Sequence, residues 1–149
     1  MKLKTLFFTC IFFISLFSFA QKTHTITLNV DTGKITKSTV NQYSNFGQSS
    51  NISNEDFTIE VNLGDTVNWI GVSSSNSNDI VKIESINHQG GARVFAKNVL
   101  RGNDNGVVSG LVKKGRAGDS EKYNVKFRVY YNGVNKSKLF KIDPKIVIR

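Results

Sequence analysis

The chain has 149 residues, a formal net charge of +9 and a hydrophobic share of 39%. Its one cysteine and its one methionine, Cys10 and Met1, both belong to an apolar N-terminal segment. If that segment is removed, the mature chain has no sulfur ligand. This excludes disulfides, thiolate metal centres, a cysteine nucleophile and a type 1 copper site.

The first 20 residues have the three parts of a secretory signal peptide. Lys2 and Lys4 give a positive start, Leu6 to Phe19 is almost wholly apolar, and Ser18-Phe19-Ala20 ends the segment with small residues at positions −3 and −1 before the cleavage point. The apolar run is shorter than the ~20 residues that a membrane-spanning helix needs. We therefore expect a signal peptide at residues 1–20, cleaved after Ala20, and a secreted or periplasmic protein.

Residues 21–149 are expected to form a single β-sandwich domain, because apolar and polar residues alternate along most of this range. A β-branched segment, Ile80 to Ile86, predicts a further strand, and Asn132-Gly133 is a strong hairpin signal. The segments 37–54 and 113–122 are predicted to be loops, and Ala92 to Leu100 is compatible with a short helix or an extended structure. The alternating residues expected to point inward are Ile26, Leu28, Val30, Phe57, Ile59, Val61, Leu63, Val67, Trp69, Tyr123, Val125, Phe127, Val129, Tyr131, Phe140, Ile142, Ile146 and Ile148.

The fold class that follows is all-β. We expect an antiparallel Greek-key-like β-sandwich of about seven to eight strands, of cupredoxin-like or immunoglobulin-like type. Its core should be built on the aromatic residues Trp69, Phe57, Tyr123, Phe127 and Phe140, with Val129 beside them.

Two segments resemble known families. Val61-Asn62-Leu63-Gly64-Asp65-Thr66-Val67-Asn68-Trp69 resembles the Gly-Asp-x-Val-x-Trp strand pair of cupredoxin-like sandwiches, in which a tight turn delivers an aromatic residue to the core. The ending from Tyr123 to Arg149, with Phe140-Lys141-Ile142-Asp143-Pro144-Lys145-Ile146, is similar to that of the AidA/PixA inclusion-body-protein family, which also carries the Gly-Asp…Trp element. This resemblance implies a sandwich without defined enzymology and, as one alternative function, a self-assembling inclusion-body-like protein.

Metal chemistry depends on two histidines. A type 1 copper site needs two imidazoles and a thiolate, whereas residues 21–149 offer His24 and His88 without any thiolate. A metal-binding protein or metal-dependent enzyme that uses His24 and His88 stays open as an alternative function. Ser109, between Gly106 and Gly110, lacks the spacing of a nucleophile elbow. We therefore expect no enzyme and no cofactor.

The positive charge is concentrated near the C-terminus. Residues 21–112 contain seven Lys or Arg and eight Asp or Glu, whereas residues 113–149 contain eleven and three. Since side chains alternate along a strand, inward Phe127, Phe140 and Ile146 place the neighbouring cations on the outer face. The residues expected to bind anions are Lys113, Lys114, Arg116, Lys126, Arg128, Tyr130, Lys141, Lys145 and Arg149.

These patterns predict a secreted, non-catalytic binding or structural module. Its basic C-terminal hairpin face would contact an anionic polysaccharide, lipid headgroups or the envelope surface. Nucleic acid is disfavoured as a partner, because the protein is exported and one aromatic residue, Tyr130, lies among the basic positions. The alternative interpretation is a solvated sheet face whose lysines protect an edge strand from aggregation.

Overall fold

The structure is a computed structural model that describes residues 21–149, so the expected signal peptide lies outside the described residues. Within this range the chain forms strands and no α-helix, and it therefore offers no helix long and apolar enough to cross a membrane. The strands are β1 (Thr23–Val30), β2 (Ser44–Asn45), β3 (Thr58–Val61), β4 (Thr66–Ser73), β5 (Ile80–Gly91), β6 (Val99–Arg101), β7 (Val108–Leu111), β8 (Ser120–Tyr131), β9 (Asn135–Lys136), β10 (Phe140–Ile142) and β11 (Lys145–Ile148).

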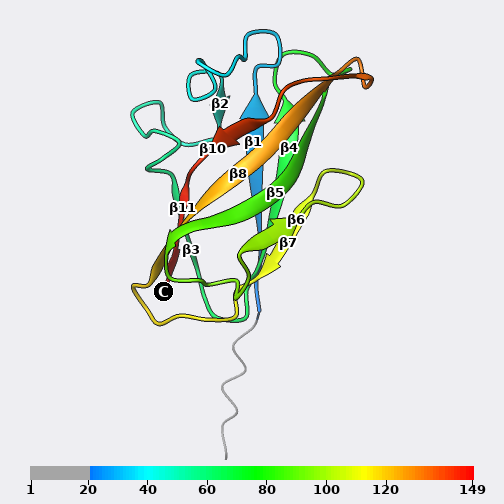
Figure 1. Cartoon of the computed structure of the whole chain (residues 1–149). Coiled ribbons are helices and arrows are strands. Elements are labelled where there is room, and N and C mark those ends of the chain that lie inside the picture. The colour runs from blue at the N-terminus through cyan, green and yellow to red at the C-terminus, as the bar shows by residue number, and fades with distance from the viewer. Residues whose placement is uncertain (1–20) are drawn as a thin grey trace, which may run out of the picture.

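The strands form two sheets that pack as a sandwich, which confirms the all-β fold class (Figure 1). Sheet A has the order β2-β1-β4-β7. Sheet B has the order β3-β11-β8-β5-β6, and β9 and β10 also pair with β8. The long strands β5 and β8 pair over most of their length and form the centre of sheet B.

Two pairings differ from the antiparallel expectation. Strands β1 and β4 run parallel, and so do β3 and β11. Parallel neighbours need a long crossover connection, and the chain supplies one, because after β1 it passes through residues 31–57 and β3 in the opposite sheet before it enters β4.

The centre of the core is aromatic, as the sequence predicts. Trp69, Tyr123 and Phe127 are fully buried. The indole Nε1–H of Trp69 donates a hydrogen bond to the Tyr123 hydroxyl at 3.2 Å, so the two polar atoms satisfy each other inside the core. Phe57 is half-buried and lies at the margin, where its ring stacks on Phe46 with centroids 4.7 Å apart.

Three local expectations need correction. Leu63 does not point inward: it is 52% exposed, because β3 ends at Val61 and the chain turns at Gly64, whose φ is +90°. The predicted loop 113–122 is shorter, since β8 already begins at Ser120. The open segment Ala92 to Leu100 is a turn-rich loop whose last two residues begin β6.

The predicted hairpin at Asn132-Gly133 is confirmed. Both residues have positive φ, +50° and +73°, and the Val134 N–H donates to the Tyr131 carbonyl at 3.1 Å. Positive φ at both central residues is what a type I′ turn requires. This turn reverses the chain from β8 into β9 at one end of sheet B.

Candidate functional site

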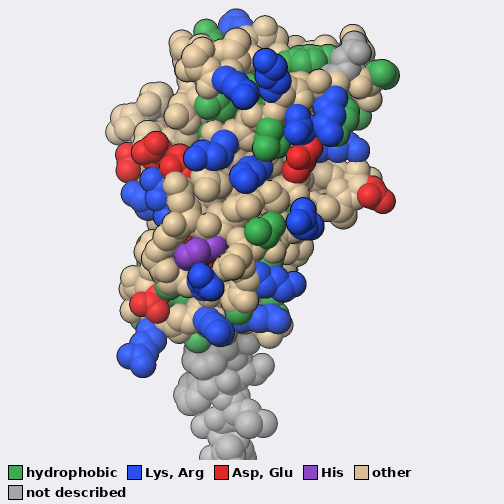
Figure 2. Space-filling model, in the orientation of Figure 1, with side chains coloured by type: hydrophobic (Ala, Val, Ile, Leu, Met, Phe, Trp, Pro, Cys, Tyr) green, Lys and Arg blue, Asp and Glu red, His purple; other side chains and the backbone are tan. Residues whose placement is uncertain are grey.

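The outer face of sheet B collects most of the predicted anion-binding residues. Along β8 the inward side chains are buried, and the alternate positions from Lys122 to Tyr130 are half-buried on the outside. Figure 2 looks onto this face and shows Lys and Arg side chains spread across it. We call it the basic face; its members are Lys82, Lys122, Lys126, Arg128, Tyr130, Lys136, Lys141 and Lys145.

Like charges lie directly opposite each other on neighbouring strands of the basic face. Lys141 on β10 is opposite Lys126 on β8, and Lys145 on β11 is opposite Lys122. On the other side of β8, Lys82 of β5 is opposite Arg128. Directly opposed like charges destabilise a sheet, so a bound anion would relieve a cost that the free protein carries.

Carboxylates neutralise the two ends of the basic face. At one end Glu84 accepts a hydrogen bond from Arg128 Nε at 2.7 Å and lies 3.7 Å from Lys136 Nζ. At the other end Asp143 lies 3.1 Å from Lys122 Nζ and raises the pKa of that ammonium by hydrogen bonding and by its charge.

The middle of the basic face keeps its charge. Lys145, opposite Lys122 at the end that Asp143 neutralises, has its own carboxylate partner, because Asp56 Oδ1 lies 3.4 Å from Lys145 Nζ. Lys126 and Lys141, by contrast, make no ion pair within the part of the chain that the structure describes. Lys126 and Lys141 are therefore directly opposed cations on this face without a carboxylate partner among the described residues.

Tyr130 is surrounded by cations and does not offer a bare aromatic surface. The ammonium groups of Lys82 and Lys136 lie 5.4 and 5.8 Å from the centroid of its ring, within cation–π range. Lys82 Nζ also donates to the carbonyl of Asp104 at 2.7 Å. These contacts hold the two lysines over the ring.

The remaining predicted residues lie at the end of the molecule that carries the C-terminus, three of them in a loop and Arg149 directly after β11, on the same side of that strand as Lys145 (Figure 1). Lys113, Lys114 and Arg116 belong to the loop between β7 and β8, where the backbone N–H groups of both lysines bond the Val94 carbonyl. Arg149 forms an ion pair with Glu60. The structure thus divides the nine predicted residues into a sheet group and an end group.

The two histidines do not form a common site. His24 lies on β1 in sheet A, with Nε2 2.8 Å from Asp65, and His88 lies on β5 in sheet B, with Nδ1 3.0 Å from Glu121. Residues 21–149 contain no group of three or more side chains able to hold a metal ion. Each imidazole instead binds its own buried carboxylate, so the arrangement gives the metal hypothesis for His24 and His88 no support.

The two buried carboxylates have opposite electrostatic characters. Burial raises the pKa of Asp65, but hydrogen bonds from the Asn62 N–H, His24 and the Lys22 N–H outweigh it and lower the pKa to about 2. Burial dominates at Glu121, which is 1% exposed, and it raises the pKa of that carboxyl despite hydrogen bonds from neighbouring groups. Both pairs join distant segments of the chain, and neither lines a described pocket.

Three members of the basic face were missed by the sequence reasoning: Lys82, Lys122 and Lys136. The alternation of inward and outward residues could have identified two of them. Lys82 lies between inward Val81 and Ile83, and Lys122 is two positions before Asn124 on the outward side of β8. Lys136 has no such pattern, because β9 is only two residues long.

One solved structure that the chain resembles is the inclusion body protein PixA from Burkholderia cenocepacia J2315. The two share 20% sequence identity with a TM-score of 0.61, and the alignment covers 89% of this chain and 99% of that chain. No family model matches the chain, and no curated protein matches it either. At this identity the similarity shows a shared fold, which agrees with the resemblance in the closing hairpin; the cupredoxin-like assignment stays a prediction.

Proposed function

We propose that the protein is an exported, non-catalytic binding module whose basic face contacts an anionic polymer, with an acidic polysaccharide as the first candidate. The observation that carries the proposal is the Lys126–Lys141 pair, two directly opposed ammonium groups without a neutralising carboxylate. An anion placed between them would turn a repulsion into two attractive contacts.

The spacing of the cations suits a linear polyanion. Outward residues follow one another along β8 at about 6.8 Å, twice the rise of an extended residue. Lys126 and Arg128 are consecutive in this row, and Lys141 and Lys82 extend it to the strands on either side. Several weak contacts to one chain add up, and each contact that releases a counterion makes the affinity depend on salt.

The test compares two double variants that remove the same charge. The double variant Lys126→Gln/Lys141→Gln removes both positive charges from the middle of the basic face. The double variant Lys113→Gln/Lys114→Gln removes the same charge from the loop between β7 and β8, called the end loop below, and is the matched control. Binding to heparin oligosaccharides is measured over a range of salt concentrations. We expect the face variant to make the negative slope of log affinity against log salt shallower by about 2, because each lysine contact contributes about one unit, and the control to change the slope much less. Equal slopes for the two variants would contradict the proposal.

Self-assembly is a second candidate, supported by the outer face of sheet A and by the fold shared with an inclusion body protein. This uncharged face consists of Thr25, Thr27, Asn29, Asn68, Ile70, Val72, Ser109 and Leu111. If the uncharged faces of two copies pack against each other, no like charges come together across the contact. Both basic faces then remain exposed on the outside of the dimer.

Sedimentation velocity over a range of protein concentrations tests this candidate. Self-assembly predicts larger species that a lysine in the middle of the uncharged face, Asn68→Lys, disperses. Gln89→Lys, on the exposed end of β5, adds the same charge elsewhere and serves as the control. A chain that stays monomeric at every concentration would eliminate the candidate.

A further inference from the structure

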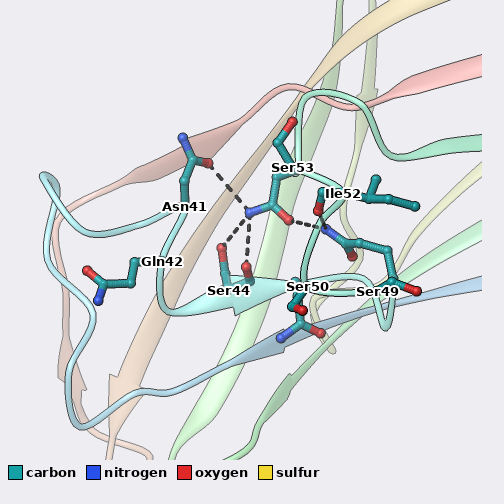
Figure 3. A pocket seen from close by; sticks show the side chains of 10 residues that line it. Asn41, Gln42, Ser44, Ser49, Ser50, Ile52 and Ser53 are labelled. Carbon is teal, nitrogen blue, oxygen red and sulfur yellow. Dashed lines mark hydrogen bonds between the residues drawn. The ribbon is translucent and has the colours of Figure 1, made fainter.

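A pocket with different chemistry lies in the long connection between β1 and β3. Its floor is organised by Asn54, which is 3% exposed. The Asn54 amide group donates to the carbonyl and hydroxyl of Ser44 at 3.0 and 3.3 Å and to Asn41 Oδ1 at 3.5 Å, and its oxygen accepts from Gln48 Nε2 at 2.9 Å (Figure 3). One buried side chain thus ties Asn41, Ser44 and Gln48 together, so the pocket is formed before any ligand arrives.

The walls of this pocket carry amides and hydroxyls and no charged side chain. The cavity measures about 400 Å³, within the ~300–1,000 Å³ that ligand pockets usually occupy. Ile52 is the one apolar side chain among its lining residues. Three polar lining residues, Gln42, Ser49 and Ser50, make no side-chain hydrogen bond within the described part of the chain, and so they retain donors and acceptors for a ligand.

The lining restricts the class of ligand. A charged ligand would lose water without gaining a counter-charge, and an apolar ligand would leave amides and hydroxyls without partners. Amides and hydroxyls donate and accept at once, which matches a molecule whose own groups do both. We propose that this pocket binds a neutral saccharide unit through its free polar side chains, with Gln42 and Ser50 among the contacts.

This inference goes beyond the proposed role of the basic face and stands without it. Sugar binding in an uncharged pocket should not depend on salt, whereas polyanion binding to the basic face should. The two ideas can therefore fail separately in one set of measurements.

The experiment follows the backbone amide signals of the labelled protein during titration with neutral disaccharides, at low and at high salt. The probes are maltose, cellobiose, lactose, mannobiose and diacetylchitobiose. We expect at least one of them to move the signals of residues 41–54 with the same affinity at both salt concentrations. Gln42→Ala and Ser50→Ala should each weaken it about fivefold, which corresponds to one hydrogen bond of about 1 kcal/mol.

Gln89→Ala, which removes an exposed amide from the far end of β5, is the matched control and should bind as the unmodified protein does. The inference is overturned if no probe moves signals in residues 41–54. It is also overturned if both pocket variants bind as tightly as the control, or if the affinity falls with salt. Heparin binding by the same variants should be unchanged, which separates this result from the fate of the basic face.

Discussion

The carboxylate of Asp65 should account for a measurable part of the stability of the fold. Its two oxygens accept the Lys22 N–H and the Asn62 N–H, both at 2.9 Å, and the second oxygen also lies 2.8 Å from His24 Nε2. The side chain therefore fastens the start of β1 to the turn between β3 and β4. Asp65→Asn keeps the shape of the side chain but removes its charge. It also replaces one acceptor oxygen with an NH2 group, which cannot accept the hydrogen bond from the donor that points at it.

The magnitude follows from the pKa of Asp65, which lies at about 2 in the folded protein against an ordinary value of 3.8. A difference of this size corresponds to about 2 kcal/mol of the free energy of unfolding. Because the folded pKa is depressed, this stability is present above pH 3.8 and is lost as the pH falls through about 2. The unmodified protein should thus exceed Asp65→Asn by about 2 kcal/mol near neutrality and by progressively less toward pH 2.

Urea unfolding at a series of pH values measures this difference, with Asp104→Asn, an exposed loop carboxylate, as the control. In a parallel thermal unfolding experiment near neutrality we expect the melting temperature of Asp65→Asn to fall by on the order of 5–10 °C and that of the control to change little. A stability difference between the unmodified protein and Asp65→Asn that stays constant from neutral pH to pH 2 would refute the reasoning, because it would show that the ionised form is not what the fold stabilises.

Two further predictions concern buried side chains, and a third concerns the exposed end of β5. Tyr123→Phe should cost about 1–3 kcal/mol in urea unfolding, because the buried Nε1–H of Trp69 loses its acceptor; an unchanged midpoint would show that this hydrogen bond contributes nothing. Glu121→Gln should flatten the pH dependence of stability: the raised pKa of the Glu121 carboxyl means that its contribution is present below pH 4.5 and is lost as the pH rises through the folded value, so a variant whose melting temperature falls just as steeply between pH 4 and 7 would be a contradiction. Gly91→Ala should cost several kcal/mol by thermal melting, because φ is +78° and the new Cβ would clash with the Ser120 carbonyl oxygen; a stability loss below 1 kcal/mol, the usual range for a tolerated change, would contradict this geometry.

Alternation along the chain was enough to predict the longer strands and most of their inward side chains. The inward residues of β1 and β8 were placed correctly because each strand buries one face, and a period of two then fixes which side chains are inside. Alternation also extends backward from Tyr123 to Glu121, so the buried carboxylate could have been found from the sequence.

Pairing partners could not be predicted in the same way. The parallel register of β1 with β4 depends on contacts between segments some 40 residues apart, and no local pattern encodes them. The sequence places Asp65 at a tight turn but does not reveal its acceptor role, because that role depends on His24 and Lys22, which come close only in the folded chain. The polar pocket escaped prediction for the same reason, since residues 41–54 show no period and are held together through Asn54.

The basic face is tested most directly by measuring, one lysine at a time, how a bound heparin oligosaccharide changes the rate of acetylation, with modified residues quantified by mass spectrometry. We expect Lys126 and Lys141 to be the most strongly protected and Lys113 and Lys114 in the end loop to react at their free rates. Protection of the end loop without protection of Lys126 and Lys141, or equal protection of all four, would contradict the assignment of the basic face as the contact surface.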